Sequence, residues 1–364
     1  MMTHYEERLE QDLAAIREQI VSVAAAVEDA LRDSVQSLLT YDRALAADVV
    51  VGDLAINRAI RQIDRKCHAF IARHLPSAGH LRLVSSVLRL NVEIERVGDY
   101  AVAISREALQ LTAAPPEVIG RDIELIADET RHMLHQALKS FHEADPELAR
   151  NAKAMSRQVE STFEKVFADL LAEGEKGSRP IRDLFAMLVI YNRLGRVGDQ
   201  AKNICEETIF ATTGETKAPK VYRVLFIDEK NNCQSQMAEA IARKAFPESG
   251  RYESAGWNPA SALENRFIEF MDRQGHSLAG AVPTSLQAVT GELADYHAIV
   301  SLEGSVESHV SSIPFHTIPL EWEVGVVPEG LDDQRTEELY REIYRQVAAQ
   351  VETLMLALRG EEAC

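Results

Sequence analysis

Carboxylates stand at matching positions in two stretches that read almost as copies of each other. Glu95 and Asp99 lie in the first stretch, and Asp199 stands 100 residues after Asp99 in the second. Residues at i and i+4 share one face of a helix, so Glu95 and Asp99 are candidates for chemistry that needs two neighbouring carboxylates. The position that matches Glu95 in the second copy is Gly195, which has no ligating side chain.

A second set of reactive residues follows an apolar strand at 221–227. Asp228 and Cys233 lie in a loop over 228–235, and a helix begins near Ser235. Backbone N–H groups at such a helix N-terminus attract oxyanions. Asp228 could be an aspartyl nucleophile, although no second Asp stands two residues later, and Cys233 could be a redox thiol. Because Lys230 is the one positive residue of the loop, we favour an incidental or structural cysteine.

The elements that carry the first set of carboxylates are predicted from a repeated apolar spacing, which is typical of a bundle seam. The first seam comprises Val87, Leu90, Ile94, Val97, Ala101 and Ile104, and the second comprises Met187, Ile190, Leu194, Val197, Ala201 and Ile204. Glu95 and Asp99 fall on the far side of the seam, so we expect them on a flank of the bundle.

Two antiparallel three-helix units are therefore predicted for the first part of the chain. The expected helices are 5–40, 43–74, 80–112, 117–142, 147–173 and 181–212. The turn that begins at Asp42 aligns with the turn that begins at Asp145. We assign residues 1–115 to the first copy and residues 116–212 to the second.

After a polar linker at 213–220, alternating strands and helices predict an α/β domain with a parallel sheet over 221–364. Further strands are expected at 251–256, 297–302 and 316–322, and helices at 263–274 and 333–358. The fold class is thus multidomain, an all-α double bundle followed by a Rossmann-like α/β domain.

The composition of the chain argues against several classes of function. The net charge of −18 and the lack of a basic stripe argue against nucleic-acid binding. The four cysteines show no C-x-x-C spacing, so neither a disulfide framework nor a zinc site is suggested. No stretch approaches 18 consecutive apolar residues and the N-terminus does not resemble a signal peptide. We expect a cytoplasmic protein without membrane insertion.

The duplicated Arg-Val-Gly-Asp helices, the opening Tyr5-Glu6-Glu7-Arg8-Leu9 and the Asp42 turn together resemble the PhoU family over residues 5 to 212. These proteins are double three-helix regulators of bacterial phosphate uptake. The resemblance implies metal clusters on the bundle surface, with Fe, Mn or Mg as ions. Its ligands would be Asp53, Glu95 and Asp99 in the first copy, and Glu160 and Asp199 in the second.

The chain departs from the family pattern at Gly195 and at Asn57, a neutral residue that is a weaker ligand. Oxygen ligands suit hard cations, yet a lost carboxylate lowers affinity. The alternative interpretation is that Glu95 and Asp99 are solvated flank residues. His132 and His135, at i and i+3, are further candidate ligands that could equally be surface histidines.

The segment from Val224 to Ala240 resembles the opening of the low-molecular-weight phosphatase and arsenate reductase family. That family has a Cys-x5-Arg-Ser loop, in which a thiolate attacks, backbone N–H groups hold the oxyanion, and the Arg clamps it. Here Asp228 stands at the nucleophile position and Gln234 at the clamp position, while Asn231 and Ser235 match. Val327 stands where the family's acid is expected. We therefore predict a degenerate phosphate loop without catalysis.

The combined prediction is a non-enzymatic regulator of phosphate uptake and phosphate-starvation signalling that acts by binding other proteins. The family resemblance implies two partners, the ATPase of a phosphate ABC transporter and a phosphate-sensing histidine kinase. The alternatives are a phosphatase or arsenate reductase with atypical groups that is targeted by the bundle, and a metal store or scaffold. Whether the chain forms a homodimer stays open.

Overall fold

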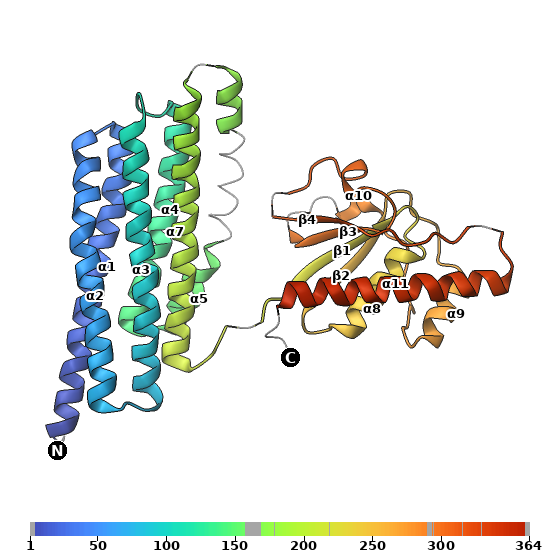
Figure 1. Cartoon of the computed structure of the whole chain (residues 1–364), viewed down its shortest axis with the longest axis horizontal. Helices are drawn as coiled ribbons and strands as arrows, with labels where there is room; N and C mark the ends of the chain where they lie inside the picture. The colour runs from blue at the N-terminus through green and yellow to red at the C-terminus, as the bar shows by residue number, and fades with distance from the viewer. Residues whose placement is uncertain are drawn as a thin grey trace. The chain divides into compact units, whose positions relative to one another are not determined.

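The computed structural model describes residues 4–156, 169–177, 179–217, 219–289, 293, 295–314, 316–328 and 330–360. The chain divides into two compact units, Met1–Lys217 and Ala218–Cys364. The first unit is helical and the second is α/β, as Figure 1 shows. The division falls inside the linker predicted at 213–220. Among the described residues, no helix has the length and apolar character needed to cross a membrane.

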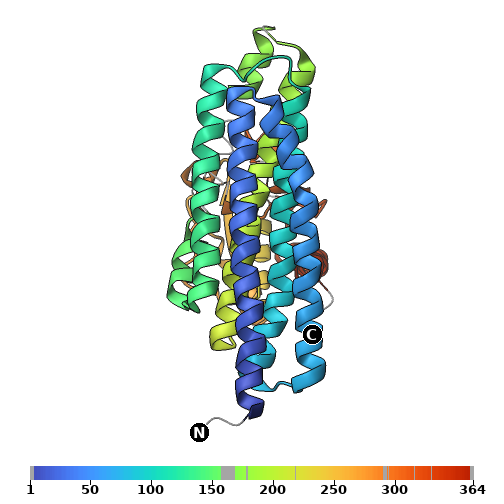
Figure 2. The same cartoon turned by 90° about the vertical axis from the view of Figure 1, so that its left-hand side faces the viewer.

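The helical unit consists of long helices that lie side by side (Figure 2). Their bounds are α1 His4–Thr40, α2 Arg43–His74, α3 Ala78–Gln110, α4 Glu117–Glu143, α5 Pro146–Ala154 and α7 Ile181–Thr213. The prediction of a helical double bundle is confirmed. The helix predicted at 147–173 begins as α5, and its middle part, 157–168, lies outside the described residues.

Both predicted seams are buried along their whole length. Every one of the twelve seam side chains belongs to one apolar core, within which α3 packs against α7 and α1 against α2 and α3. Glu95 and Asp99 are exposed, as expected from their angular position on α3. The seam therefore fixes which face of α3 is available to ligands or partners.

The second helix of each copy has an aspartate as its N-cap, Asp42 in the first copy and Asp145 in the second. The Oδ1 atom of Asp42 accepts from the backbone N–H groups of Ala44 and Leu45, each at 3.0 Å. Asp145 Oδ1 accepts from Glu147 N at 2.9 Å and Leu148 N at 3.0 Å. N-caps of this kind satisfy N–H groups that have no partner within the helix, which explains why the two turns align in sequence.

The α/β unit contains a parallel four-stranded sheet of order β2-β1-β3-β4. The strands are β1 Tyr222–Asp228, β2 Gly250–Gly256, β3 Ala298–Ser301 and β4 Ile318–Glu321. Side chains alternate along β1, so that Val224 and Phe226 join one core and Leu225 and Ile227 join another on the opposite face.

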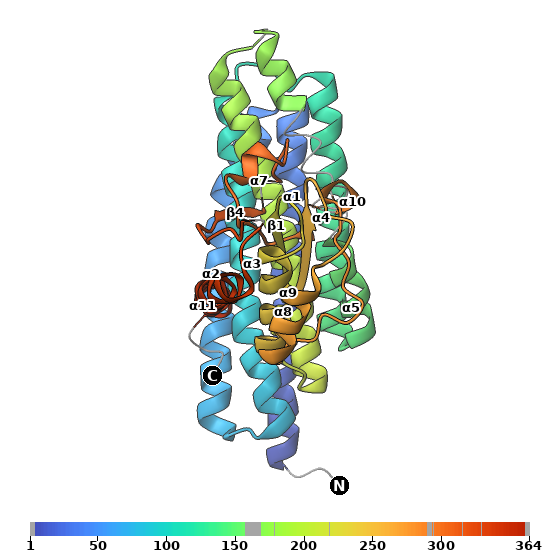
Figure 3. The ribbon, with the colours of Figure 1, turned by 90° about the vertical axis from the view of Figure 1, so that its right-hand side faces the viewer.

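Helices pack against both faces of the sheet, and Figure 3 labels them around the strands. They are α8 Gln234–Ala245, α9 Asn265–Arg273, α10 Leu286–Val289 and α11 Asp333–Arg359, with a 3-10 turn η2 at Val306–Ser308. The first core is completed by α8, α9 and α11, and the second by α10 and η2. The sequence did not predict α10 and η2, because elements this short show no apolar period.

Candidate functional site

Asp228 lies at the end of β1 with its side chain buried inside the following loop. It belongs to the strand, whereas the sequence placed it as the first loop residue. Its Oδ1 atom accepts from Asn231 N at 2.5 Å, and its Oδ2 atom accepts from Ser235 N at 2.8 Å. Only 1% of Asp228 is exposed. The carboxylate thus takes two of the backbone N–H groups that a loop at a helix N-terminus offers to an anion.

Asn231 holds the loop in shape through both ends of its side chain. Its backbone is left-handed, with φ of 47°, a conformation that Asn tolerates better than most residues. The Nδ2 atom donates to Ser235 Oγ at 2.8 Å, and Oδ1 accepts from Thr284 N at 2.7 Å. A Cβ atom on Gly256 would lie 2.8 Å from Asn231 N, so only glycine allows the end of β2 to approach this closely.

Glu303, just after β3, reaches the same loop. Its Oε2 atom accepts from Glu229 N at 2.9 Å. A third loop N–H group is therefore hydrogen-bonded to a carboxylate of the protein itself. Burial raises the pKa of Asp228 to about 6, the hydrogen bonds from Ser235 and Asn231 act against this rise, and the charge of Glu303 adds to it.

A cleft of about 570 Å³ opens beside the loop at the carboxyl ends of β1 and β3. We call it the strand-end cleft, and its wall includes Lys230, Cys233, Gln234, Glu264, Glu303 and Val327. Gln234 turns its Nε2 atom to Gly325 O at 3.2 Å. A neutral amide cannot supply the bidentate charge clamp of an arginine.

Cys233 is a free cysteine in the wall of this cleft, 9% exposed. Burial raises the pKa of its thiol well above the ordinary value, and the charges of Asp228, Glu264 and Glu303 raise it further. The thiolate is the nucleophilic form of cysteine. A thiol held in its protonated form favours the interpretation of Cys233 as an unreactive residue.

The flank of the first helical copy brings together Asp53 and Asn57 on α2 with Asp99 on α3. Asn57 Nδ2 donates to Asp53 Oδ2 at 2.6 Å. The pKa of Asp53 is raised by burial and then by the charge of Asp99, while Arg106 opposes the rise. The Oδ1 atoms of Asp53 and Asn57 are buried and have no hydrogen-bond partner among the described residues.

The remaining predicted ligands are placed less favourably. Glu95 is exposed on α3, one turn before Asp99. In the second copy, Asp199 Oδ2 lies 3.2 Å from Arg196 Nη1, in an ion pair on the surface. Glu160 lies outside the described residues. Among the residues that the structure describes, no group of three or more His, Cys, Asp or Glu side chains is arranged to hold a metal ion.

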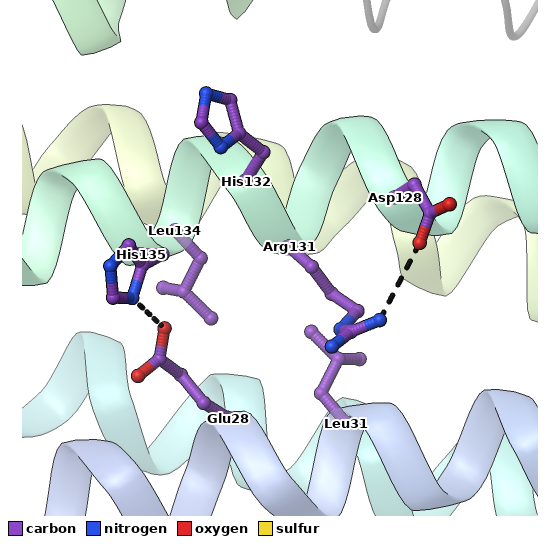
Figure 4. A pocket seen from close by; sticks show the side chains of 7 residues that line it. All are labelled: Glu28, Leu31, Asp128, Arg131, His132, Leu134 and His135. Carbon is purple, nitrogen blue, oxygen red and sulfur yellow. Dashed lines mark hydrogen bonds and ion pairs between the residues drawn. The ribbon is translucent and has the colours of Figure 1, made fainter.

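His132 and His135 both line a cavity of about 320 Å³ between α1 and α4, where Figure 4 shows their rings pointing to different sides of α4. His135 Nδ1 lies 3.0 Å from Glu28 Oε1 on α1. The two rings do not converge on one point, so the pair is not a two-histidine ligand set.

Comparison with known proteins gives a match for each unit. The PhoU domain family matches residues 20–108 and 123–208, and the family described as low molecular weight phosphotyrosine protein phosphatase matches residues 223–363. The chain is 30% identical over 212 residues to the phosphate-specific transport system accessory protein PhoU of Edwardsiella tarda, a match that covers 58% of this chain and 87% of that protein.

Two solved structures are also similar to part of the chain. The crystal structure of PhoU from Pseudomonas aeruginosa is 28% identical with a TM-score of 0.54, and the match covers 57% of this chain and 99% of that chain. An arsenate reductase in the phosphate binding state is 22% identical with a TM-score of 0.32, over 38% of this chain and 100% of that one. The chain belongs to the PhoU family, and it carries a low-molecular-weight phosphatase domain after the bundle.

Sequence reasoning missed Glu303 and Thr284 as partners of the loop. A signal for Glu303 existed, because it follows a predicted parallel strand, and the carboxyl ends of parallel strands meet at one edge of the sheet. Thr284 contributes only its backbone N–H group, and its residue type therefore carried no such signal.

Proposed function

We propose that this protein regulates phosphate uptake and phosphate-starvation signalling by binding other proteins, without turning over a substrate. Support comes from its membership of the PhoU family and from relatives described as accessory proteins of phosphate-specific transport systems. By the family resemblance, the partners are the ATPase of a phosphate ABC transporter and a phosphate-sensing histidine kinase. The bundle is the unit that makes these contacts.

The α/β domain is, in this proposal, a pseudophosphatase. The observation that carries the proposal is the position of the Asp228 carboxylate, which accepts from the N–H groups of Asn231 and Ser235. A carboxylate at this place repels an incoming phosphate dianion and uses donors that would have held it. Gln234 adds no countercharge, and Val327 supplies no acid in the cleft wall.

Turnover by the full chain tests this proposal against its rival, an atypical phosphatase or arsenate reductase. We expect no hydrolysis of an aryl phosphate and no thiol-dependent reduction of arsenate above a blank without protein. The double variant Asp228→Cys with Gln234→Arg restores the thiol and the clamp, and we expect it to regain binding of inorganic phosphate in calorimetry. Turnover by the unmodified chain that is abolished in Asp228→Ala would establish the rival function.

We also propose that the flank of the first copy binds a hard cation such as Mn²⁺, Mg²⁺ or Fe. The orphaned, buried Oδ1 atoms of Asp53 and Asn57 support this, as does the nearby charge of Asp99. A cation at this position would accept these oxygens as ligands and offset the repulsion between the two aspartates. By the family resemblance, Glu95 belongs to the same ligand set.

A further inference from the structure

The strand-end cleft lies where the topology of the sheet opens a crevice. In the order β2-β1-β3-β4, the connection after β1 leads to one side of that strand, and the chain returns to the other side to form β3. Loops that diverge in this way leave a binding crevice at the carboxyl ends of the strands. The volume of about 570 Å³ is typical of small-molecule sites.

The charges around this cleft are mainly negative. Glu229, Glu264 and Glu303 line it together with the cations Lys230 and Arg266. The Nη1 atom of Arg266 lies 2.7 Å from Asp333 Oδ1, which offsets one of these cations. Three of the loop N–H groups, those of Glu229, Asn231 and Ser235, are hydrogen-bonded to Asp228 and Glu303 and are therefore not offered to an anion.

The thiol of Cys233 lies among the same carboxylates. It lines the cleft, is 9% exposed and forms no disulfide. After burial, the charges of Asp228, Glu264 and Glu303 raise the pKa of this thiol. A negative potential that opposes ionisation of a thiol also favours a positively charged ligand.

Apolar side chains also line the cleft. Val326, Val327 and Leu331 line it in the segment before α11. A lining that holds both apolar side chains and carboxylates suits a ligand with a charged head and an aliphatic stem, because the stem can be buried while the head is neutralised. Phosphate and arsenate have no such stem and carry the wrong charge.

We propose that the strand-end cleft binds an organic cation, a guanidinium or ammonium group on an aliphatic stem, in place of an oxyanion. This inference rests on the proposed function, in which the domain is retained for binding after its catalytic groups are lost. The same chemistry is presented by an arginine or lysine side chain of a partner protein and by a free amine.

Calorimetry on the full chain tests the inference with three probes: agmatine, the blocked peptide acetyl-Gly-Arg-Gly-amide, and inorganic phosphate. We expect saturable binding of the cations and none of phosphate. Tighter binding of the peptide would identify a protein side chain as the source, and tighter binding of agmatine a free amine. Either order supports the proposal.

Variants locate the cation within the cleft. Glu264→Gln combined with Glu303→Gln should weaken cation binding at least tenfold, while the amide oxygen introduced at position 303 can still accept from Glu229 N. Glu352→Gln makes the same kind of charge change at an exposed site on α11 and should leave binding unchanged. If the double variant unfolds at a lower temperature than the parent, cation binding is compared between the parent and the single variant Glu264→Gln.

The proposal is overturned if neither cation binds saturably, if the cleft variants bind as the parent does, or if phosphate binds and competes with agmatine. These outcomes leave the proposed regulatory function intact, since that function is judged by turnover and by contact with phosphate-uptake partners.

Discussion

The side chain of Asp228 fills the loop at a place where a loop of this kind would otherwise bind an anion. Two hydrogen bonds from backbone N–H groups stabilise the ionised carboxylate, but burial destabilises it by more. The pKa of Asp228 therefore rises from 3.8 to about 6. In the folded state the group therefore holds its proton more tightly than in the unfolded chain. The ionised form of this residue opposes folding of the α/β unit near neutral pH.

The stability of the α/β unit should consequently depend on pH between about 4 and 6. Protonated Asp228 contributes fully to stability below pH 3.8, its pKa in the unfolded chain, and this contribution is lost as the pH rises through about 6, its pKa in the folded state. The loss is about 3 kcal/mol, at 1.4 kcal/mol for each pH unit of the difference. Urea unfolding can be followed by fluorescence, because Trp257 and Trp322 are the two tryptophans of the chain and both lie in this unit.

Asp228→Asn is the matched variant, because its amide does not ionise in this range. As the pH rises from 4 to 7, the unfolding free energy of the parent should fall relative to that of the variant. A difference that stays constant across this range would mean that Asp228 ionises at its ordinary pKa.

Metal binding should depend more on Asp99 than on Asp199. The charge of Asp99 acts on Asp53, whose buried Oδ1 atom has no hydrogen-bond partner among the described residues, whereas Asp199 pairs with Arg196 on the surface. Titration with Mn²⁺ by calorimetry should show at least tenfold weaker binding in Asp99→Ala and a smaller change in Asp199→Ala. Equal losses in the two variants, or no Mn²⁺ binding by the parent, would contradict this ranking.

The residue identities at the loop could be predicted from sequence because the motif has fixed spacing. Asp228, Gln234 and Ser235 could be placed by counting from the strand. Their partners could not, since Glu303 and Thr284 are distant in sequence and only the fold brings them to the loop. The orphaned oxygen of Asp53 was equally inaccessible, because it depends on the packing of α2 against α3.

The paired N-caps suggest a simple experiment on single helices. Asp42→Ala should destabilise the helical unit by about 1 kcal/mol, because the N–H groups of Ala44 and Leu45 lose their acceptor. For a unit of this size the melting temperature should fall by about 2–4 °C in circular dichroism. Asp42→Asn keeps an acceptor and should recover most of the loss.

Asp48→Ala serves as the control, because Asp48 is exposed within the same helix α2 and is not its cap. A fall in melting temperature as large as that of Asp42→Ala would show that the effect comes from general charge and not from the cap.

Long helices could be predicted well because each shows many turns of the same apolar period, as in α3 and α7. Short elements could not. The strand β3 covers only Ala298–Ser301 and β4 only Ile318–Glu321, so their predicted bounds extend past the hydrogen-bonded ladder. Strand ends are set by pairing with neighbours, which local sequence does not encode.

Each unit of the molecule has its own apolar core. The helical unit is built around one core that runs from Leu9 to Ile209, and the α/β unit has a core on each face of its sheet. Independent cores indicate that each unit can fold by itself. The proposed roles can therefore be separated by truncation, with residues 1–217 as the regulatory part.

The most direct measurement is phosphate-responsive repression in cells that lack this protein and receive either the full chain or residues 1–217. The account predicts that the helical unit alone restores repression at high phosphate, at least in part, and that Asp228→Ala in the full chain behaves as the parent does. Helical circular dichroism of the purified fragment confirms that it is folded. Loss of repression by a folded fragment, or by Asp228→Ala, would show that the α/β domain carries the essential activity and would contradict the account.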